Sequence, residues 1–147
     1  MAFDFMGIIP PVVTPFDENG DIKVGAIRKN VRFLLDKGVH GICFGGSTGE
    51  GHTLTGDELV TIAEECAAEV NGEVPLIAGI IVNSTRDAVQ KAKRMEGLID
   101  AFQITPVHYL FKPDEDATYR HFETITGETD KPVLIYNVIP WNYLSPA

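Results

Sequence analysis

A glycine-rich loop with two hydroxyl residues is the first segment of this sequence that could do chemistry. In "GGSTGEG", glycines stand at positions 45, 46, 49 and 51 around Ser47 and Thr48. Glycine permits tight turns and close approach to a ligand, so N–H groups can converge on an anion while the hydroxyls donate to it. No lysine follows Gly49, and the spacing is not G-x-G-x-x-G, so neither common phosphate loop fits. The loop favours a carboxylate ligand; its alternative is a structural turn between strand and helix.

Tyrosines that follow two apolar runs are the second group of candidates. Tyr136 closes the run "PVLIY", where a phenol could shuttle a proton to a bound molecule. His108 and Tyr109 lie just after another run, in the loop "PVHYLFKP". The alternative for each is a side chain that covers the core with its polar group in water, and position alone favours that alternative for Tyr136.

Five short apolar runs indicate how these residues are positioned. The runs begin at Gly7, Val39, Pro75, Ala101 and Pro132 and have the composition of strands buried on both faces. The segments between them carry apolar residues at helical spacing, so each can lay one face on a sheet. This alternation predicts right-handed crossovers and a parallel sheet, hence an α/β fold. Periodicity leaves two closures open: a doubly wound open sheet and part of an eightfold barrel.

Helix-capping residues support the same element order. Thr55 and Ser84 each stand three residues before an acid, as at a helix start, and glycines at 38, 72, 97 and 127 lie where helices would end. In parallel α/β folds, ligands bind where strands lead into helices. That rule selects the candidate positions 14–16, 46–51, 83, 105–109 and 136–137.

Composition and charge restrict the class of protein. The chain of 147 residues has the size of one domain, so we predict a single domain over residues 1–147. A net charge of −9 argues against nucleic acid as a partner. No apolar run approaches the roughly 18 residues that span a bilayer, which argues against a membrane span. The N-terminus lacks a secretory pattern and only two cysteines are present, which favours the cytoplasm.

Cysteines and histidines offer no further site. Cys43 falls inside a predicted strand and Cys66 on the apolar face of a predicted helix, so we expect both to pack rather than to react. The four histidines show no ligand spacing with cysteines or acids, and we predict no metal site. They are His40, His52, His108 and His121.

Four motifs resemble, in order and spacing, one enzyme superfamily. "GIIPPVVTPF", "GGSTGE", "TP" followed by "YRHF", and "YNVIP" are similar to segments of dihydrodipicolinate synthase and N-acetylneuraminate lyase. The resemblance covers the whole chain from Gly7. It implies a (β/α)8 TIM barrel and a class I aldolase or lyase that forms a Schiff base with pyruvate or another 2-oxo acid. It also implies a homotetramer that needs no cofactor.

The resemblance implies roles for individual residues. Ser47, Thr48 and the adjoining Gly49 match the segment that holds the substrate carboxylate, and Thr48 also matches a member of the proton relay. Tyr136 matches the phenol that donates and accepts protons. Tyr109 resembles the relay tyrosine that reaches a neighbouring subunit, although its loop differs from the Pro-Tyr-Tyr of the synthases. Serine at position 47 resembles the lyase branch, and "NVIPWNYLSP" departs from the Pro-Gly-Arg-Thr of the synthases, which argues against a role in lysine biosynthesis.

The Schiff-base lysine that this superfamily carries on its sixth strand has no counterpart in the sequence. Such a lysine needs a buried strand position that lowers its pKa. Six of the seven lysines fall in predicted helices or loops, and Lys131 lies at the wrong end of the fifth strand. Because a (β/α)8 barrel typically needs about 250 residues, we expect the N-terminal portion of a barrel, with about five parallel strands and four helices, inactive alone.

Two other hypotheses stay open at this point. One is a non-catalytic half-barrel that binds small carboxylates or a partner that completes the sheet. The other is an open flavodoxin-like sheet that binds a nucleotide or flavin.

Overall fold

The computed structural model describes residues 5–107 and 113–138 of the chain. In this part, four strands form one parallel sheet in the order β1-β2-β3-β4. The strands are β1 (Ile42–Phe44), β2 (Leu76–Ile80), β3 (Ala101–Ile104) and β4 (Val133–Ile135). The helices are α1 (Val24–Asp36), α2 (Gly56–Val70), α3 (Thr85–Met95) and α4 (Glu115–Thr126). The chain has the predicted α/β fold, with helical crossovers between neighbouring parallel strands.

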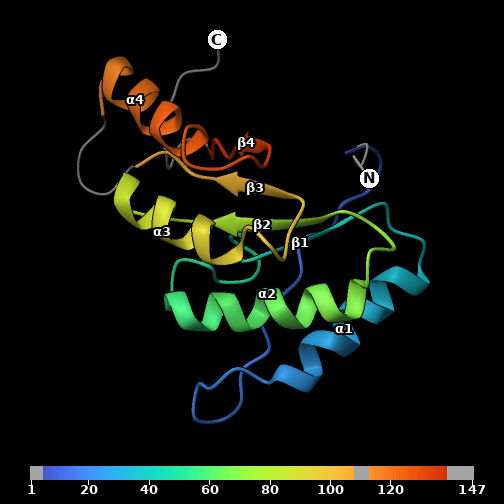
Figure 1. Ribbon diagram of the computed structural model, residues 1–147. Coiled ribbons are helices and arrows are strands. Elements are labelled where there is room, and N and C mark those ends of the chain that lie inside the picture. The colour runs from blue at the N-terminus through green and yellow to red at the C-terminus, as the bar shows by residue number, and fades with distance from the viewer. Residues whose placement is uncertain (1–4, 108–112, 139–147) are drawn as a thin grey trace.

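The helices follow one another around one side of the sheet (Figure 1). α1 packs on α2, α2 on α3, and α3 on α4. The main core lies between these helices and the sheet, and Phe44, Phe102 and Ile104 are among its fully buried side chains. Side chains on the other face of the strands form a smaller apolar cluster around Cys43 and Ile77. The sheet therefore has a helix-covered outer face and an inner face.

The run that begins at Gly7 is an extended segment beside β1 rather than a fifth strand. The N–H of Cys43 donates to the carbonyl of Pro10 at 3.2 Å, and the N–H of Val12 donates to the carbonyl of Cys43 at 2.7 Å. The pairing is parallel but confined to one bridge at Pro11, because two consecutive prolines have no N–H to donate. The expected fifth strand is thus present as a paired segment outside the regular ladder.

Helix ends follow the predicted residues. The hydroxyl of Thr55 accepts from the N–H of Glu58 at 3.2 Å, and the Glu58 carboxylate accepts from the N–H of Thr55 at 2.7 Å, which completes a capping box. Ser84 caps α3 by accepting from the N–H of Asp87 at 3.1 Å. The predicted glycines lie at the C-terminal ends of the helices. Glycines 38, 72 and 97 directly follow the C-caps of α1, α2 and α3, and the C-cap of α2 is left-handed. Glycine 127 is itself the C-cap of α4.

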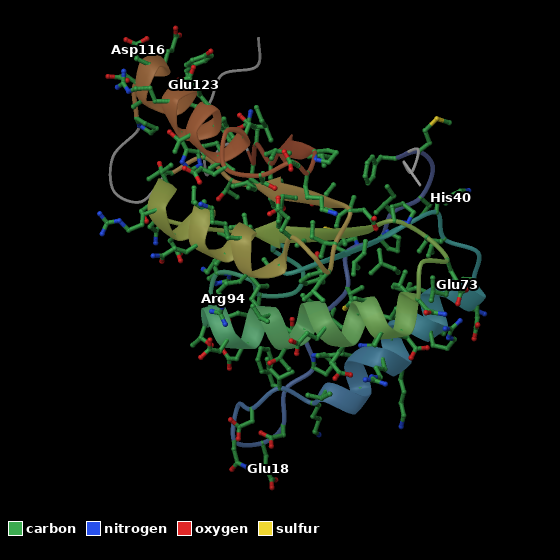
Figure 2. All side chains as sticks on the ribbon, viewed as in Figure 1. Glu18, His40, Glu73, Arg94, Asp116 and Glu123 are labelled. Carbon is green, nitrogen blue, oxygen red and sulfur yellow. The ribbon has the colours of Figure 1, made fainter. Side chains whose placement is uncertain are left out.

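Ion pairs join neighbouring helices on the outer surface. Arg94 of α3, labelled in Figure 2, pairs with Asp57 at the start of α2 at 2.7 Å. Arg32 of α1 pairs with Glu69 of α2 at 2.6 Å. These side chains are partly or largely exposed, so water and salt screen each pair and its contribution to stability is small. Helix order therefore rests on the core rather than on these charges.

Candidate active site

The glycine-rich loop leaves the end of β1 and folds back on itself before α2. The N–H groups of Gly49 and Gly51 donate to the carbonyl of Gly46 at 3.1 and 3.0 Å, which closes a turn. Ser47 and Thr48 stand at the exposed tip of that turn. No hydrogen bond within the described residues occupies their own N–H groups. The tip of the loop therefore carries two exposed hydroxyl residues whose amides make no hydrogen bond in the described part of the chain, while the amide of Gly49 holds the turn.

Close backbone contacts place this loop directly over the sheet. A methyl group added at Gly79, in β2, would lie 2.6 Å from the nitrogen of Gly46, and one added at Gly51 would lie 1.7 Å from the carbonyl oxygen of Gly45. Such distances leave no room for a side chain at either position. Sequence reasoning missed Gly79, although a glycine inside an apolar strand pattern is a signal of close backbone approach.

Thr14, in the extended segment, is hydrogen-bonded to the glycine-rich loop. Its buried hydroxyl donates to the carbonyl of Gly49 at 2.7 Å. The segment is itself held on β1 by the bond from Val12 to Cys43. The rule for strand ends had selected position 14 as a candidate, and the structure gives Thr14 a contact that positions the loop.

Tyr136 and Ser47 meet although they lie 89 residues apart in sequence. The phenol of Tyr136 donates to the hydroxyl of Ser47 at 3.1 Å. Tyr136 is placed by its own N–H, which donates to the carbonyl of Ile104 at 2.8 Å and continues the pairing of β4 with β3. The loop after β1 and the end of β4 are therefore in contact across the ends of the two strands between them.

The other aromatic candidates lie elsewhere. Tyr109 and His108 fall outside the described residues. Asn83 is exposed immediately before the cap of α3. Of the tyrosines predicted to transfer protons, the structure therefore brings Tyr136 to the loop.

His121 is a buried structural residue between α4, α3 and the end of β3. Its Nε2–H donates to the carbonyl of Thr105 at 3.1 Å, and its Nδ1 accepts from the hydroxyl of Thr85 at 2.9 Å. Burial lowers the pKa of His121 from its ordinary value of 6.5, although the bond to Thr105 acts in the opposite direction. At neutral pH the ring is uncharged, and its two hydrogen bonds join α4 to the start of α3 and to the end of β3.

Both cysteines are buried thiols, as the sequence predicted. Burial raises the pKa of Cys43 to about 11 and that of Cys66 to about 12. Neither forms a thiolate at neutral pH, so neither is an activated nucleophile.

Two other classes of site find no support in residues 5–107 and 113–138. These residues contain no group of three or more His, Cys, Asp or Glu side chains that could hold a metal. They also contain no helix that is long and apolar enough to cross a membrane. His40, labelled in Figure 2, lies at the opposite end of the sheet from the loop, where its Nδ1 accepts from the N–H of Ile8 at 3.0 Å.

No lysine in the described part of the chain lies on a strand. Lys91 and Lys93 form ion pairs on α3, with Asp87 and Glu128. The remaining four lie in α1, at its two caps, or in the loop before β4: Lys29, Lys23, Lys37 and Lys131. None of these positions is a buried strand site that would favour a neutral amine.

Comparison with known proteins identifies the family. The pattern of the Dihydrodipicolinate synthetase family matches residues 4–141. The chain belongs to this family. The 4-hydroxy-tetrahydrodipicolinate synthase of Lactococcus lactis subsp. lactis is 41% identical over 134 residues, which are 89% of this chain and 44% of that protein. The chain spans about half the length of the curated relatives it matches.

Solved structures of family members share the fold. The dihydrodipicolinate synthase DapA-2 of Bacillus anthracis superposes with a TM-score of 0.90 at 36% identity, over 97% of this chain and 49% of that chain. YagE, a prophage protein of E. coli K12 solved in complex with pyruvate, gives a TM-score of 0.90 at 28% identity, over 95% of this chain and 47% of that chain. The family resemblance is confirmed, and the sheet is part of a TIM barrel rather than an open flavodoxin-like sheet.

Proposed function

We propose that this chain supplies the carboxylate-binding and proton-transfer part of an aldolase or lyase that forms a Schiff base with pyruvate or another 2-oxo acid. The observation that carries the proposal is the 3.1 Å bond from Tyr136 to Ser47. It sets a proton donor and acceptor directly against the hydroxyl of an anion-binding turn. Membership of the family supports the same reaction class, as does the pyruvate bound to YagE.

The proposed roles follow from the free donors of the turn. The substrate carboxylate accepts hydrogen bonds from the hydroxyls and N–H groups of Ser47 and Thr48, and bonds to an ionised acceptor are stronger than neutral ones. Gly49 contributes the shape of the turn. Tyr136 exchanges a proton with the reacting carbon or oxygen, with Thr48 in the relay. Tyr109 is proposed to reach the site of a neighbouring subunit in a homotetramer and to act there in the relay, and no cofactor is required.

The proposal assigns the Schiff-base lysine to sequence that follows this chain. The described lysines are on helices or in loops, and the relatives are about twice as long. The whole chain is proposed to be one domain, the N-terminal part of the barrel, without catalytic activity alone. In that part the turn binds the acid, and the bond to Ser47 positions Tyr136 for proton transfer.

The proposal is tested by trapping the Schiff base. We define the joined polypeptide as this chain followed by the C-terminal half of the Lactococcus lactis relative. Pyruvate with borohydride should add one reduced pyruvate to a lysine of the appended half, and no adduct should form on the chain alone. Ser47→Ala should slow trapping about tenfold or more, since it removes a bond to a charged group. Thr124→Ala, at an exposed position of α4, is the control and should trap at the original rate.

A second candidate function is carboxylate binding without catalysis. The position of the described lysines on helices and loops favours it. It requires that the chain binds pyruvate in an equilibrium titration while the joined polypeptide yields no borohydride adduct. An adduct on the joined polypeptide would eliminate this second function.

A further inference from the structure

The inner face of the sheet carries one carboxamide beside otherwise apolar or small residues. The cluster on that face consists of Cys43, Ile77 and Ala101, with Phe5 and Ile9 packed against it. Gln103 is the next inward-facing residue of β3 after Ala101, because successive strand residues alternate between faces. A carboxamide on such a surface is costly unless its polar atoms find partners. The hydrogen bonds of the Gln103 carboxamide therefore indicate its role.

Gly79, the neighbour of Gln103 on β2, leaves space for the side chain of Gln103. The register pairs Gln103 with Gly79 on β2, so no side chain stands next to Gln103 on that strand. The missing side chain of Gly79 is also what admits the backbone of Gly46, which would lie 2.6 Å from an added methyl group. Gln103 therefore lies next to Gly79, where the backbone of the glycine-rich loop passes over the inner face.

The orientation of the carboxamide is set by Cys43. The thiol of Cys43 donates to Oε1 of Gln103 at 3.1 Å. Burial raises the pKa of this thiol to about 11, so it keeps the proton that it donates. The amino group of a carboxamide diverges from its oxygen, so Nε2 is directed away from Cys43. Nε2 has no partner among the described residues and is not a buried unsatisfied atom, so it is open to a ligand on the inner face.

Gln103 also lies near the contact between Tyr136 and Ser47. Leu134 is its register partner on β4, and Tyr136, which directly follows β4 and continues its pairing with β3, is the next inward-facing residue. The bond from Tyr136 to Ser47 spans the ends of β2 and β3. An acid whose carboxylate is held at the tip of the turn would extend from there toward the inner face. The oxygen on its second carbon would then face the free donor of Gln103.

We propose that Gln103 is a substrate-contacting residue whose Nε2–H donates a hydrogen bond to the 2-oxo oxygen of the bound acid. The proposal rests on the proposed function, because it takes the carboxylate site at Ser47 and Thr48 as given. It divides recognition into two parts. The turn recognises the carboxylate, and Gln103 distinguishes a 2-oxo acid from a simple carboxylic acid.

The test compares pyruvate with propionate, which has the same carbon chain and carboxylate but no 2-oxo oxygen. Affinities of the full chain for both acids are measured by NMR titration, with circular dichroism melting to check the fold of each variant. Gln103→Leu should weaken pyruvate about fivefold, as expected for one neutral hydrogen bond, and leave propionate unchanged. Gln103→Glu, which replaces the donor with a carboxylate of the same length, should weaken pyruvate further. Ser47→Ala should weaken both acids.

A matched control is Gln90→Leu, at an exposed position of α3, which should change neither affinity. If Gln103→Leu binds pyruvate as well as the unaltered chain does, or loses both acids equally, the inference is overturned while the carboxylate site stands. If the unaltered chain binds neither acid, the proposed function fails together with the inference. Because Gln103→Glu offers an independent comparison, a folding defect in Gln103→Leu alone does not decide the outcome.

Discussion

At the residue scale, the bond from Tyr136 to Ser47 determines what the turn can donate. The hydroxyl oxygen of Ser47 accepts a hydrogen bond from the phenol of Tyr136, with 3.1 Å between the two oxygens. The hydroxyl of Ser47 can therefore donate its own proton to an anion. Hydrogen bonds in such a chain polarise one another. A bound carboxylate would therefore be coupled through Ser47 to Tyr136, the residue proposed to transfer the proton.

Replacing Tyr136 by phenylalanine tests this coupling. Tyr136→Phe removes the donor to Ser47 but keeps the ring, so turnover of the joined polypeptide should fall about 10²- to 10⁴-fold, the usual contribution of a positioned acid or base. The rate with pyruvate and an aldehyde is followed at saturating substrate. Tyr119→Phe, on the exposed surface of α4, is the control. Equal rates for Tyr136→Phe and the control would refute a role for the phenol in proton transfer.

Thr14 supports the turn through its hydrogen bond to the carbonyl of Gly49. Thr14→Val has nearly the same shape but leaves the carbonyl of Gly49 without its 2.7 Å donor. The free energy of unfolding should fall by about 1–3 kcal/mol, the cost of an unsatisfied buried polar group. Urea denaturation measures the change. Thr14→Ser keeps the hydroxyl and should recover most of the loss; a Thr14→Val chain as stable as the original would contradict this role.

At the element scale, features set by local hydrogen bonds were predictable from sequence and features set by strand pairing were less so. The capping box at Thr55 involves residues three apart, and the sequence indicated it. The apolar run at Gly7 predicted a strand, but Pro10 and Pro11 interrupt the ladder that defines one. The Ser47 and Tyr136 loops were both selected by the strand-end rule, whereas their contact depends on how four strands pair, which no local pattern contains.

Gly79 links the register of β2 to the shape of the loop. Gly79→Ala places a methyl group 2.6 Å from the nitrogen of Gly46, so the loop or strand must shift. The free energy of unfolding should fall by about 3 kcal/mol, as for other overpacked positions. Gly25→Ala is a matched control in α1 with open space around the added methyl, and it should raise stability by roughly 0.5 kcal/mol. Equal urea midpoints for the two variants would contradict the close approach.

His121 makes the packing of α4 sensitive to pH. Its folded pKa is below 6.5, so below that pH the unfolded chain binds more protons than the folded chain. The stabilising effect is complete above pH 6.5 and is lost as the pH falls. Urea midpoints should decrease as the pH falls from about 6.5 to about 5, a range above the titration of most carboxylates. His121→Gln should flatten this dependence, and a slope equal to that of the unaltered chain would contradict the role of His121.

At the scale of the whole molecule, apolar side chains are exposed at both lateral edges of the sheet. Ile8 and Val13 are 67% and 51% exposed on the extended segment, and Leu134 and Ile135 are 39% and 58% exposed on β4. These edges also carry backbone groups without a neighbouring strand among the described residues. Apolar edges of this kind pair readily with another chain.

The isolated chain should therefore associate with itself as its concentration rises. Light scattering after size exclusion should give a mass above the 16.1 kDa of one chain. Leu134→Lys combined with Ile135→Lys puts charge on the β4 edge and should shift the mass toward one chain, because a buried lysine would have to lose its hydration. Phe33→Lys, which removes from α1 an apolar side chain as exposed as that of Ile135, should leave association unaltered. A mass of one chain at every concentration would contradict association through these edges.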